Sequence, residues 1–225
     1  MPRPSHRRPG DLRAVSVEVL PDGRKLITAP LSDEDVRQLA AGDVVVVRGI
    51  VYAARDAAHK RMVEELDEGQ ALPFPPAGAI IYYTGPTPER PGNVIGSAGP
   101  TTASRMDKYT PRILEQGVKG LIGKGGRGPA IREELKKHNA VYMAALGGGG
   151  ALSALTVRKQ EVIAFPELGP EAVRAVEFFD FPVWVVNDCE GRDFYEQSAA
   201  PYRKNDMLPE DLRIAIDTHD ANGGG

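Results

Sequence analysis

Cysteine is almost absent from this sequence, which has a single one, Cys189, in 225 residues. No internal disulfide can form, which fits a reducing compartment, so we expect a cytoplasmic location. An iron–sulfur cubane needs three or four thiolate ligands, and one cysteine excludes such a cluster held by this chain alone. We interpret Cys189 as a small, inert side chain.

Long apolar segments are also missing. The best candidate, 44–54, is interrupted by Arg48 and is far too short to span a bilayer. The first ten residues, MPRPSHRRPG, are basic and rich in proline but lack the apolar stretch of a signal peptide. The net charge of −3 argues against a general nucleic-acid binder. We therefore expect neither a membrane nor a nucleic acid as partner, whereas a small anion needs only a local group of cations.

Glycine and proline are abundant, with 25 and 19 residues, and predict many tight turns. We expect one domain over 12–197, preceded by a flexible tail at 1–11 and followed by a C-terminal extension at 198–225. The extension contains one helix-like segment, DLRIAI at 211–216.

Short strands and helices are expected to alternate along the domain, which predicts an α/β fold with layers built on a mixed sheet. A strand pair at 12–28 turns at 21–23, and Ser32 caps a short helix that stops by Gly42. The next strand is 43–52, followed by a helix from about 55 to 69, a strand at 79–86 and a surface loop at 84–100. The later strands are expected at 121–123, 140–146, 161–168 and 181–187, and the later helices at 127–139, 149–157 and 169–179; a last segment, RDFYEQ, covers 192–197.

The first candidate site is the segment GPTTASRMD at 99–107. A glycine–proline turn leads into small hydroxyl residues, and Arg105 follows Thr101 by four positions. If a helix starts here, unpaired amides, hydroxyls and a guanidinium face one anion, which suits a carboxylate. An ordinary helix start, with Arg105 paired to Asp107 or to solvent, is the alternative.

Two glycine-rich segments could also contact an anion. The glycines around Lys124, in GLIGKGGRG at 120–128, let the backbone approach a ligand closely. This segment lacks the spacing of a P-loop but resembles the GXXG loop of KH domains, which requires a helix on each side. Four glycines at 147–150 suit either an anion nest or close backbone packing. A plain turn with a solvated lysine is the alternative at Lys124.

The third candidate is Arg55, which follows a strand expected to be buried on both faces. Ligands of α/β sheets bind at the carboxyl ends of strands. Asp56 could cap the helix that begins here, and His59 lies one helical turn on. His59 could carry a proton or support the site, or it could be an ordinary helix histidine.

Four segments, taken together and in this order, resemble one known family. They are VYAARDAAHKR (51–61), GPTTASRMDKYTPRILEQGVKGLIGKGGR (99–127), AVYMAALGGGGAL (140–152) and FPELGPEAVRAVEFFDFPVWVVND (165–188). They are similar to the β-subunit, or C-terminal half, of class I fumarases and L-tartrate dehydratases, over about Val17 to Gln197. Two positions depart from the family pattern: Ser104 stands where the family commonly has glycine, and Gly126 where it has Asn or Tyr.

The resemblance implies a swivelling β/β/α fold for a catalytic domain at 12–197. It also implies a hydro-lyase that reversibly hydrates fumarate to L-malate, a reaction of the tricarboxylic acid cycle. A partner α-subunit would carry a [4Fe–4S] cluster whose open iron acts as a Lewis acid on the dicarboxylate. The assembly would be a hetero-oligomer of α2β2 type, with a β–β contact as a further option.

The resemblance also assigns roles to residues of this chain. Arg55, Thr101, Arg105 and Lys124 match the family's substrate-contacting positions, and the three cations would neutralise the two carboxylates. Thr101 and Arg105 are the catalytic candidates, with the Thr101 hydroxyl handling a proton once a neighbour activates it. Supporting roles fall to Asp56, His59 and Thr102, and no residue is assigned to a metal.

Three other interpretations stay open. An L-tartrate dehydratase β-subunit would run the same chemistry on another substrate. A KH-like binder of single-stranded nucleic acid would use 123–126, against the acidic charge balance and the scarcity of aromatics near that loop. A binding or scaffolding relative that has lost catalysis is the third.

Overall fold

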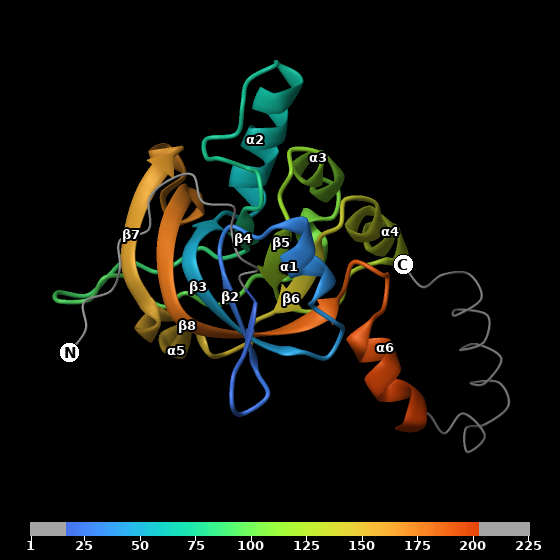
Figure 1. Ribbon diagram of the computed structural model, residues 1–225. Coiled ribbons are helices and arrows are strands. Elements are labelled where there is room, and N and C mark those ends of the chain that lie inside the picture. The colour runs from blue at the N-terminus through green and yellow to red at the C-terminus, as the bar shows by residue number, and fades with distance from the viewer. Residues whose placement is uncertain (1–16, 203–225) are drawn as a thin grey trace, which may run out of the picture.

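One mixed sheet of eight strands forms the centre of the computed structural model, which describes residues 17–202 (Figure 1). The strands are β1 Glu18–Val19, β2 Lys25–Thr28, β3 Val44–Ala53, β4 Ile80–Tyr82, β5 Gly120–Gly123, β6 Val141–Ala144, β7 Val157–Ala164 and β8 Val173–Asn187. The helices are α1 Asp33–Arg37, α2 Asp56–Asp67, α3 Thr110–Leu114, α4 Pro129–Lys137, α5 Gly150–Leu155 and α6 Phe194–Ala199, with short 3-10 turns η1 Ala103–Met106, η2 Pro166–Glu171 and η3 Ala200–Tyr202. The predicted α/β class with a mixed sheet is confirmed.

The sheet closes into a barrel-like ring. Strands β2 to β6 lie parallel to their neighbours in the order β2-β3-β4-β5-β6. The long strand β8 then runs antiparallel to both β6 and β3, so strands β3, β4, β5, β6 and β8 close into a ring. Strand β7 pairs antiparallel with the first part of β8, on the edge opposite β3. Strand β1 pairs antiparallel with β2. Closure removes most of the free strand edges that an open sheet would expose.

Alternating side chains along the central strands fill two different cores. In β4, Ile80 and Tyr82 point into the ring interior, whereas Ile81 packs toward the helices. The same division separates Ile122 from Leu121 in β5. Because successive side chains of a strand point to opposite faces, these strands are apolar at every position.

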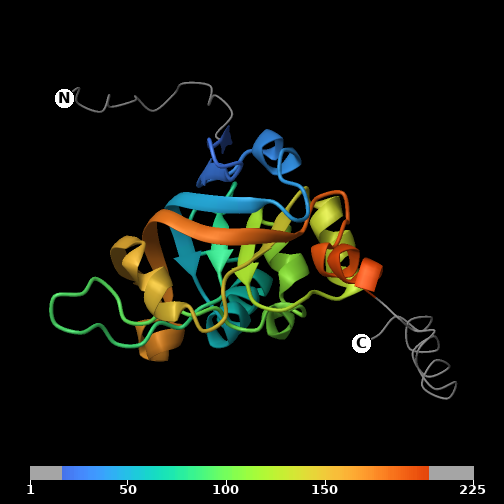
Figure 2. The same ribbon diagram turned by 90° about the horizontal axis from the view of Figure 1, so that it is seen from below.

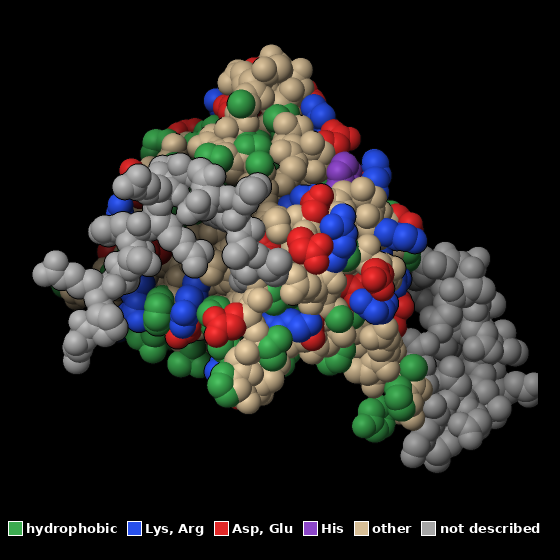
Figure 3. Space-filling model, viewed as in Figure 1, with side chains coloured by type: hydrophobic (Ala, Val, Ile, Leu, Met, Phe, Trp, Pro, Cys, Tyr) green, Lys and Arg blue, Asp and Glu red, His purple; other side chains and the backbone are tan. Residues whose placement is uncertain are grey.

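Helices α2, α3 and α4 cover one side of the ring, and β3 and β8 cross the opposite side (Figure 2). In the face shown in Figure 3, acidic and basic side chains are interspersed over α1 and α4. Lys119 and Asp33 pair there at 2.7 Å. Within residues 17–202 we find no helix with the length and hydropathy of a membrane span.

Most of the predicted elements are present. The first strand pair is antiparallel and turns at 21–23, and Ser32 forms a capping box with Asp35 at the start of α1. Helix α2 begins after Arg55, which takes the cap position without a side-chain bond, so the predicted Asp56 cap is wrong. The predicted strand at 161–168 starts earlier, at Val157, and ends before η2. The tail at 1–11 and the segment 211–216 lie outside the described residues.

The predicted helix at 169–179 is wrong, because this segment starts within η2 and then enters strand β8. Val176 and Phe178 alternate inward, and Phe181 and Val183 resume the alternation one residue out of phase. The shift occurs at a bulge, where Asp180 has a positive φ of 63°. An alternating pattern with one inserted residue imitates the spacing of a helix in sequence.

Candidate functional site

The carboxyl ends of four parallel strands meet at one edge of the ring. Arg55 lies two residues after β3, Lys124 directly follows β5, and the glycines at 147–150 follow β6. The chain returns from the loop 84–100 so that the N–H of Thr101 donates to the carbonyl of Tyr83, just past β4, at 2.7 Å. Parallel strands bring their carboxyl ends to the same edge, which is where such sheets bind ligands.

Backbone pairing fixes the threonine segment against the lysine loop. The N–H of Lys124 donates to the carbonyl of Thr101 at 3.0 Å, and the N–H of Ala103 donates to the carbonyl of Lys124 at 2.9 Å. Thr102 and Lys124 thereby form an isolated parallel bridge. Thr101 is almost buried and Lys124 is exposed. We use the name cationic cradle for Arg55, Thr101, Arg105 and Lys124.

Asp56 joins the two arginines of the cradle. Its Oδ1 lies 2.7 Å from Nε of Arg105, and its Oδ2 lies 3.1 Å from Nε of Arg55. The sequence predicted only a supporting role for Asp56, and its geometry is that of a shared counterion. Arg105 therefore pairs with Asp56, whereas Asp107 pairs with Arg127. Asp56 thus links the two arginines, while backbone pairing links the threonine segment to Lys124.

A second carboxylate, that of Glu171, reaches the cradle from η2. Its Oε1 lies 3.4 Å from Nε of Arg55, and its Oε2 accepts from the N–H of Ala57 at 2.7 Å. The latter bond satisfies one of the free amides in the first turn of α2. Sequence reasoning missed Glu171, because it was assigned to a helix and its partners are 114 and more positions away.

The electrostatic surroundings keep Asp56 ionised. Partial burial opposes the charged form, but a backbone N–H, the hydrogen bond from Arg55 and the charge of Arg105 together hold the pKa of Asp56 below its usual value. With Glu171 also close, both arginines have carboxylate partners before any ligand binds. Among the three cations of the cradle, Lys124 is exposed and has no carboxylate partner within residues 17–202.

His59 lies fully buried beneath Arg55. Its Nδ1–H donates to the carbonyl of Arg55 at 3.0 Å, and its ring meets Tyr83 edge to face with centroids 5.2 Å apart. No group of the described residues bonds its Nε2. Burial lowers the pKa of His59 to about 4, so the ring is neutral at pH 7. This position suits a role for His59 in holding the backbone of Arg55 in place.

Arg127 organises the underside of the cradle, and sequence reasoning did not single it out. Its fully buried guanidinium binds Oδ1 of Asp107 at 2.7 Å, Oγ1 of Thr110 at 2.6 Å and the Tyr83 hydroxyl at 3.3 Å. It thus connects the lysine loop to the η1–α3 segment and to the end of β4. Three donors used in a fixed geometry make this side chain a rigid connection. The signal in the sequence was Asp107, the aspartate of the RMD string, because a carboxylate at this position required a cationic partner.

The two glycine segments have packing reasons of their own. An added Cβ at Gly150 would lie 2.5 Å from Oγ of Ser97 and 2.8 Å from the nitrogen of Gly99, which supports the close-packing interpretation. Gly147 lies beside the lysine, 4.0 Å from Cδ of Lys124 for an added Cβ. The lysine loop follows strand β5, so the helix that a KH loop requires on that side is absent.

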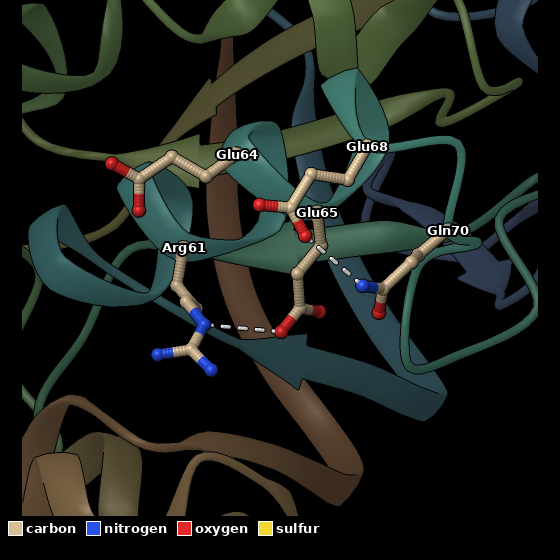
Figure 4. Close-up of a pocket in the computed structure, with 5 residues that line it drawn as sticks. All are labelled: Arg61, Glu64, Glu65, Glu68 and Gln70. Carbon is tan, nitrogen blue, oxygen red and sulfur yellow. Dashed lines mark hydrogen bonds and ion pairs between the residues drawn. The ribbon is translucent and has the colours of Figure 1, made fainter.

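A separate pocket of about 390 Å³ lies along the second half of α2 (Figure 4). Three glutamates and one arginine line it together with Gln70, and the arginine is already bonded to Glu65 at 3.1 Å. Its negative charge would repel an anionic ligand. The cradle is therefore the better candidate for binding a carboxylate.

The residues of this chain do not fit an iron–sulfur cluster. Across residues 17–202, no three His, Cys, Asp or Glu side chains are grouped to hold a metal ion. Cys189 is half-buried against the ring core, and burial raises the pKa of its thiol. A thiol of raised pKa is a poor ligand and nucleophile.

Comparison with known proteins gives one consistent family. The family model described as "Fumarase C-terminus" matches residues 16–198. The aerobic class I fumarate hydratase of Salmonella typhimurium is 33% identical over 195 residues, which cover 85% of this chain and 32% of that protein. Fumarate hydratase 2 of Leishmania major is 37% identical over 169 residues, 74% of this chain and 30% of that protein.

A relative of different length is found in Methanocaldococcus jannaschii. This protein, provisionally named as the beta subunit of an L(+)-tartrate dehydratase, is 36% identical over 173 residues, 74% of this chain and 89% of that protein. The chain thus spans about a third of the length of the two fumarate hydratases and most of the archaeal subunit. On the family match and these identities, the chain belongs to the Fumarase C-terminus family.

Proposed function

We propose that this chain binds a C4 dicarboxylate for the reversible hydration of fumarate to L-malate, as one part of a class I fumarate hydratase. The observation that carries the proposal is the cationic cradle, which gathers three cations and a nearly buried threonine at one edge of the ring in a member of this family. The closed mixed sheet with helices on one side supports assignment to the swivelling β/β/α fold.

The missing part of the enzyme is proposed to be a companion polypeptide. About two thirds of each fumarate hydratase lies outside the match, and the archaeal relative is named as a subunit. The companion, or α-subunit, would hold the [4Fe–4S] cluster, because the described residues of this chain have no suitable ligand group. When bound there, the cluster supplies Lewis acidity toward the substrate. A hetero-oligomer of α2β2 type follows as the proposed assembly.

The chain's own residues would bind the substrate and hold a proton. Arg55 and Arg105 can grip carboxylate oxygens through their guanidinium groups, and Lys124 adds a point charge. Hydration forms a C–O bond to one alkene carbon and a C–H bond to the other, both from one water molecule. We assign the hydroxyl of Thr101 to the proton that moves to or from carbon. A free hydroxyl is a weak acid and base, so a neighbouring group must activate it.

Dehydration of L-tartrate is the second candidate, favoured by the similarity to the archaeal subunit. Tartrate is also a C4 dicarboxylate, and the same cations would bind it. The extra hydroxyl requires space or a polar partner near the reacting carbons. Gly126, two residues after Lys124, has no side chain where the family commonly has a larger one, and this difference favours the substrate with the extra hydroxyl.

The proposed function is tested by purifying the chain alone and together with the companion polypeptide, both anaerobically. Fumarate hydration and L-tartrate dehydration are followed by absorbance. Only the combined proteins should turn over substrate, and the ratio of kcat/KM values identifies the dicarboxylate. Full activity from the chain alone would refute the two-part enzyme, and turnover of neither substrate by an assembled complex would refute the hydro-lyase.

A further inference from the structure

Three exposed leucines lie within ten residues of the chain, two of them in helix α5 and one just before it. Leu146, Leu152 and Leu155 are 58%, 70% and 74% exposed, and we call them the leucine patch. In α5, Gly150 and Ser153 face the protein, while Leu152 and Leu155, three positions apart, share the outer face. Grouped apolar side chains of this kind on a surface mark an interaction site more often than isolated ones do.

A groove lies beside the patch, between α5 and the loop 84–100. This cavity of about 500 Å³ has a mixed lining, with apolar Leu155, Ala151, Ala154 and Val94 and polar residues that include Arg90 and Asn93. Figures 1 and 2 both show α5 and this loop at the same end of the molecule, and the N–H of Ala98 donates to the carbonyl of Gly150 at 3.0 Å. A partner could therefore insert side chains between the helix and the loop.

The leucine patch adjoins the cationic cradle. The segment from Leu146 to Gly150 leads from β6 into α5, and Gly147 within it lies beside the lysine of the cradle. Gly99, two residues before Thr101, contacts Gly150. A polypeptide that covers the open side of the cradle would therefore also meet the patch.

Other exposed apolar side chains have a different setting. Phe179 lies under the guanidinium groups of Arg48 and Arg158, at 4.4 and 5.0 Å from its ring centre. Ile50 is a single half-exposed side chain on strand β3, where its backbone partner is Glu177 of β8. The leucine patch is distinguished by its grouping, its groove and its position beside the cradle.

We propose that the leucine patch is the docking surface for the companion polypeptide, an inference that rests on the proposed function. The relatives that contain this domain as about a third of their length must pack the remainder against some surface of it. Lys124 and Arg105 are exposed in the chain by itself. Their electrostatic interaction with a bound dicarboxylate becomes stronger when water is excluded. One partner that seats on the leucines would also close the cradle.

The test uses the full chain and the purified companion, that is, the polypeptide from the same genome that is similar to the remaining two thirds of the class I fumarate hydratases. The double variant Leu152→Gln/Leu155→Gln removes apolar surface with little effect on helix propensity. Ile50→Gln is the matched control, since it removes a half-exposed apolar side chain elsewhere. Circular dichroism and thermal unfolding verify that all three proteins are folded.

The dissociation constant for the companion should rise at least tenfold in the double variant and less than twofold in Ile50→Gln. At saturating companion, kcat for the preferred dicarboxylate should stay within about twofold of wild type. Equal binding by wild type and double variant, or no binding by wild type, overturns the docking surface. So does a double variant that loses only self-association, which assigns the patch to a second copy. A complex that depends on the patch but hydrates nothing leaves the docking surface intact and refutes the proposed function.

Discussion

Asp56 is the residue on which the geometry of the cradle depends most directly. One carboxylate oxygen binds Arg105 and the other binds Arg55, so two side chains from different segments share a single counterion. Charge-assisted hydrogen bonds of this kind hold flexible side chains in one orientation. The guanidinium groups are therefore positioned before a ligand arrives.

Replacing Arg105 with alanine should strongly reduce turnover in the assembled enzyme. Loss of a cation that pairs with a desolvated carboxylate costs about 2–5 kcal/mol, or roughly 30-fold to several-thousand-fold in kcat/KM. The measurement is steady-state hydration kinetics with the companion present. Arg37→Ala, which removes an exposed arginine from α1, should leave kcat/KM unchanged. A threefold loss or less in Arg105→Ala would place this residue outside the site.

Asp56→Asn should remove a contribution to stability that depends on pH. Since the pKa of Asp56 is lower in the folded state than in the unfolded chain, its ionised form stabilises the fold above the unfolded value of about 4. This contribution is lost as the pH falls through the folded pKa. The difference in unfolding free energy between wild type and Asp56→Asn, measured in urea, should be largest near pH 7 and shrink below pH 4. A constant difference would contradict the ion pairs.

Several residues of the candidate site could be predicted from the sequence, because their positions depend on the strands that immediately precede them. Arg55 and Lys124 follow strands whose apolar pattern is plain in sequence, and strand ends share one edge. Glu171 and Arg127 could not be assigned, because their roles depend on partners brought together only by the closed sheet. The pairing of Arg105 with Asp56 could not be predicted for the same reason, because the two residues are 49 positions apart in the sequence.

Among the elements, the connection between the lysine loop and the η1–α3 segment depends on Arg127. Its fully buried guanidinium pairs with Asp107, so Arg127→Met should leave a partly buried carboxylate unpaired and cost about 3–5 kcal/mol of unfolding free energy. The double variant Arg127→Met/Asp107→Asn should recover part of that loss, as measured by a double-mutant cycle in denaturant. Arg112→Ala, which breaks an exposed pair with Asp67, is the control and should change little.

Additive losses in that cycle would contradict the pair. The positioning role of Arg127 is measured separately, through KM. Arg127→Met displaces Lys124 and should raise KM for the dicarboxylate. Arg127→Lys keeps the charge but not the three hydrogen bonds of the guanidinium, and its KM should stay close to that of Arg127→Met.

Helix α5 and the loop 84–100 approach each other at Gly150. Since an added methyl group would meet Ser97 and Gly99 at less than 3 Å, Gly150→Ala should destabilise the protein by about 1–3 kcal/mol. Gly126→Ala is the matched control, because the nearest atom to its added Cβ is Cδ2 of Tyr195 at an ordinary contact distance of 3.8 Å, and it should stay within about 0.5 kcal/mol. The measurement is the unfolding free energy of both variants in a chemical denaturant. Equal unfolding free energies would contradict the close packing at Gly150.

The mistaken helix at 169–179 shows where sequence patterns lose information. Strand β8 changes phase at its bulge, and Pro182 stands where the edge facing β6 and β7 is unpaired. A proline without N–H is tolerated at such an edge. Whether a strand has a paired edge depends on segments far away in the chain, so this element was predictable only over its regular part, 181–187.

For the whole molecule, closure by β8 is the feature that determines stability. This strand contacts three others, β3, β6 and β7, and its inward side chains fill the ring core. Amide hydrogens of β3 and β8 should therefore exchange only through global unfolding, whereas those of the loop 84–100 exchange through local opening. Native-state hydrogen exchange followed by mass spectrometry measures this. Protection of β8 no greater than that of the loop would contradict a closed ring.

The shared counterion of the cradle also bears on how an assembled enzyme could release its product. An incoming dianion would exchange places with carboxylates that the protein already provides, and a departing one would be replaced by them. Neither step would leave the two guanidinium groups without a carboxylate partner, which keeps the free-energy change of both steps small. Affinity moderated in this way suits a reversible reaction whose substrate and product carry the same charge.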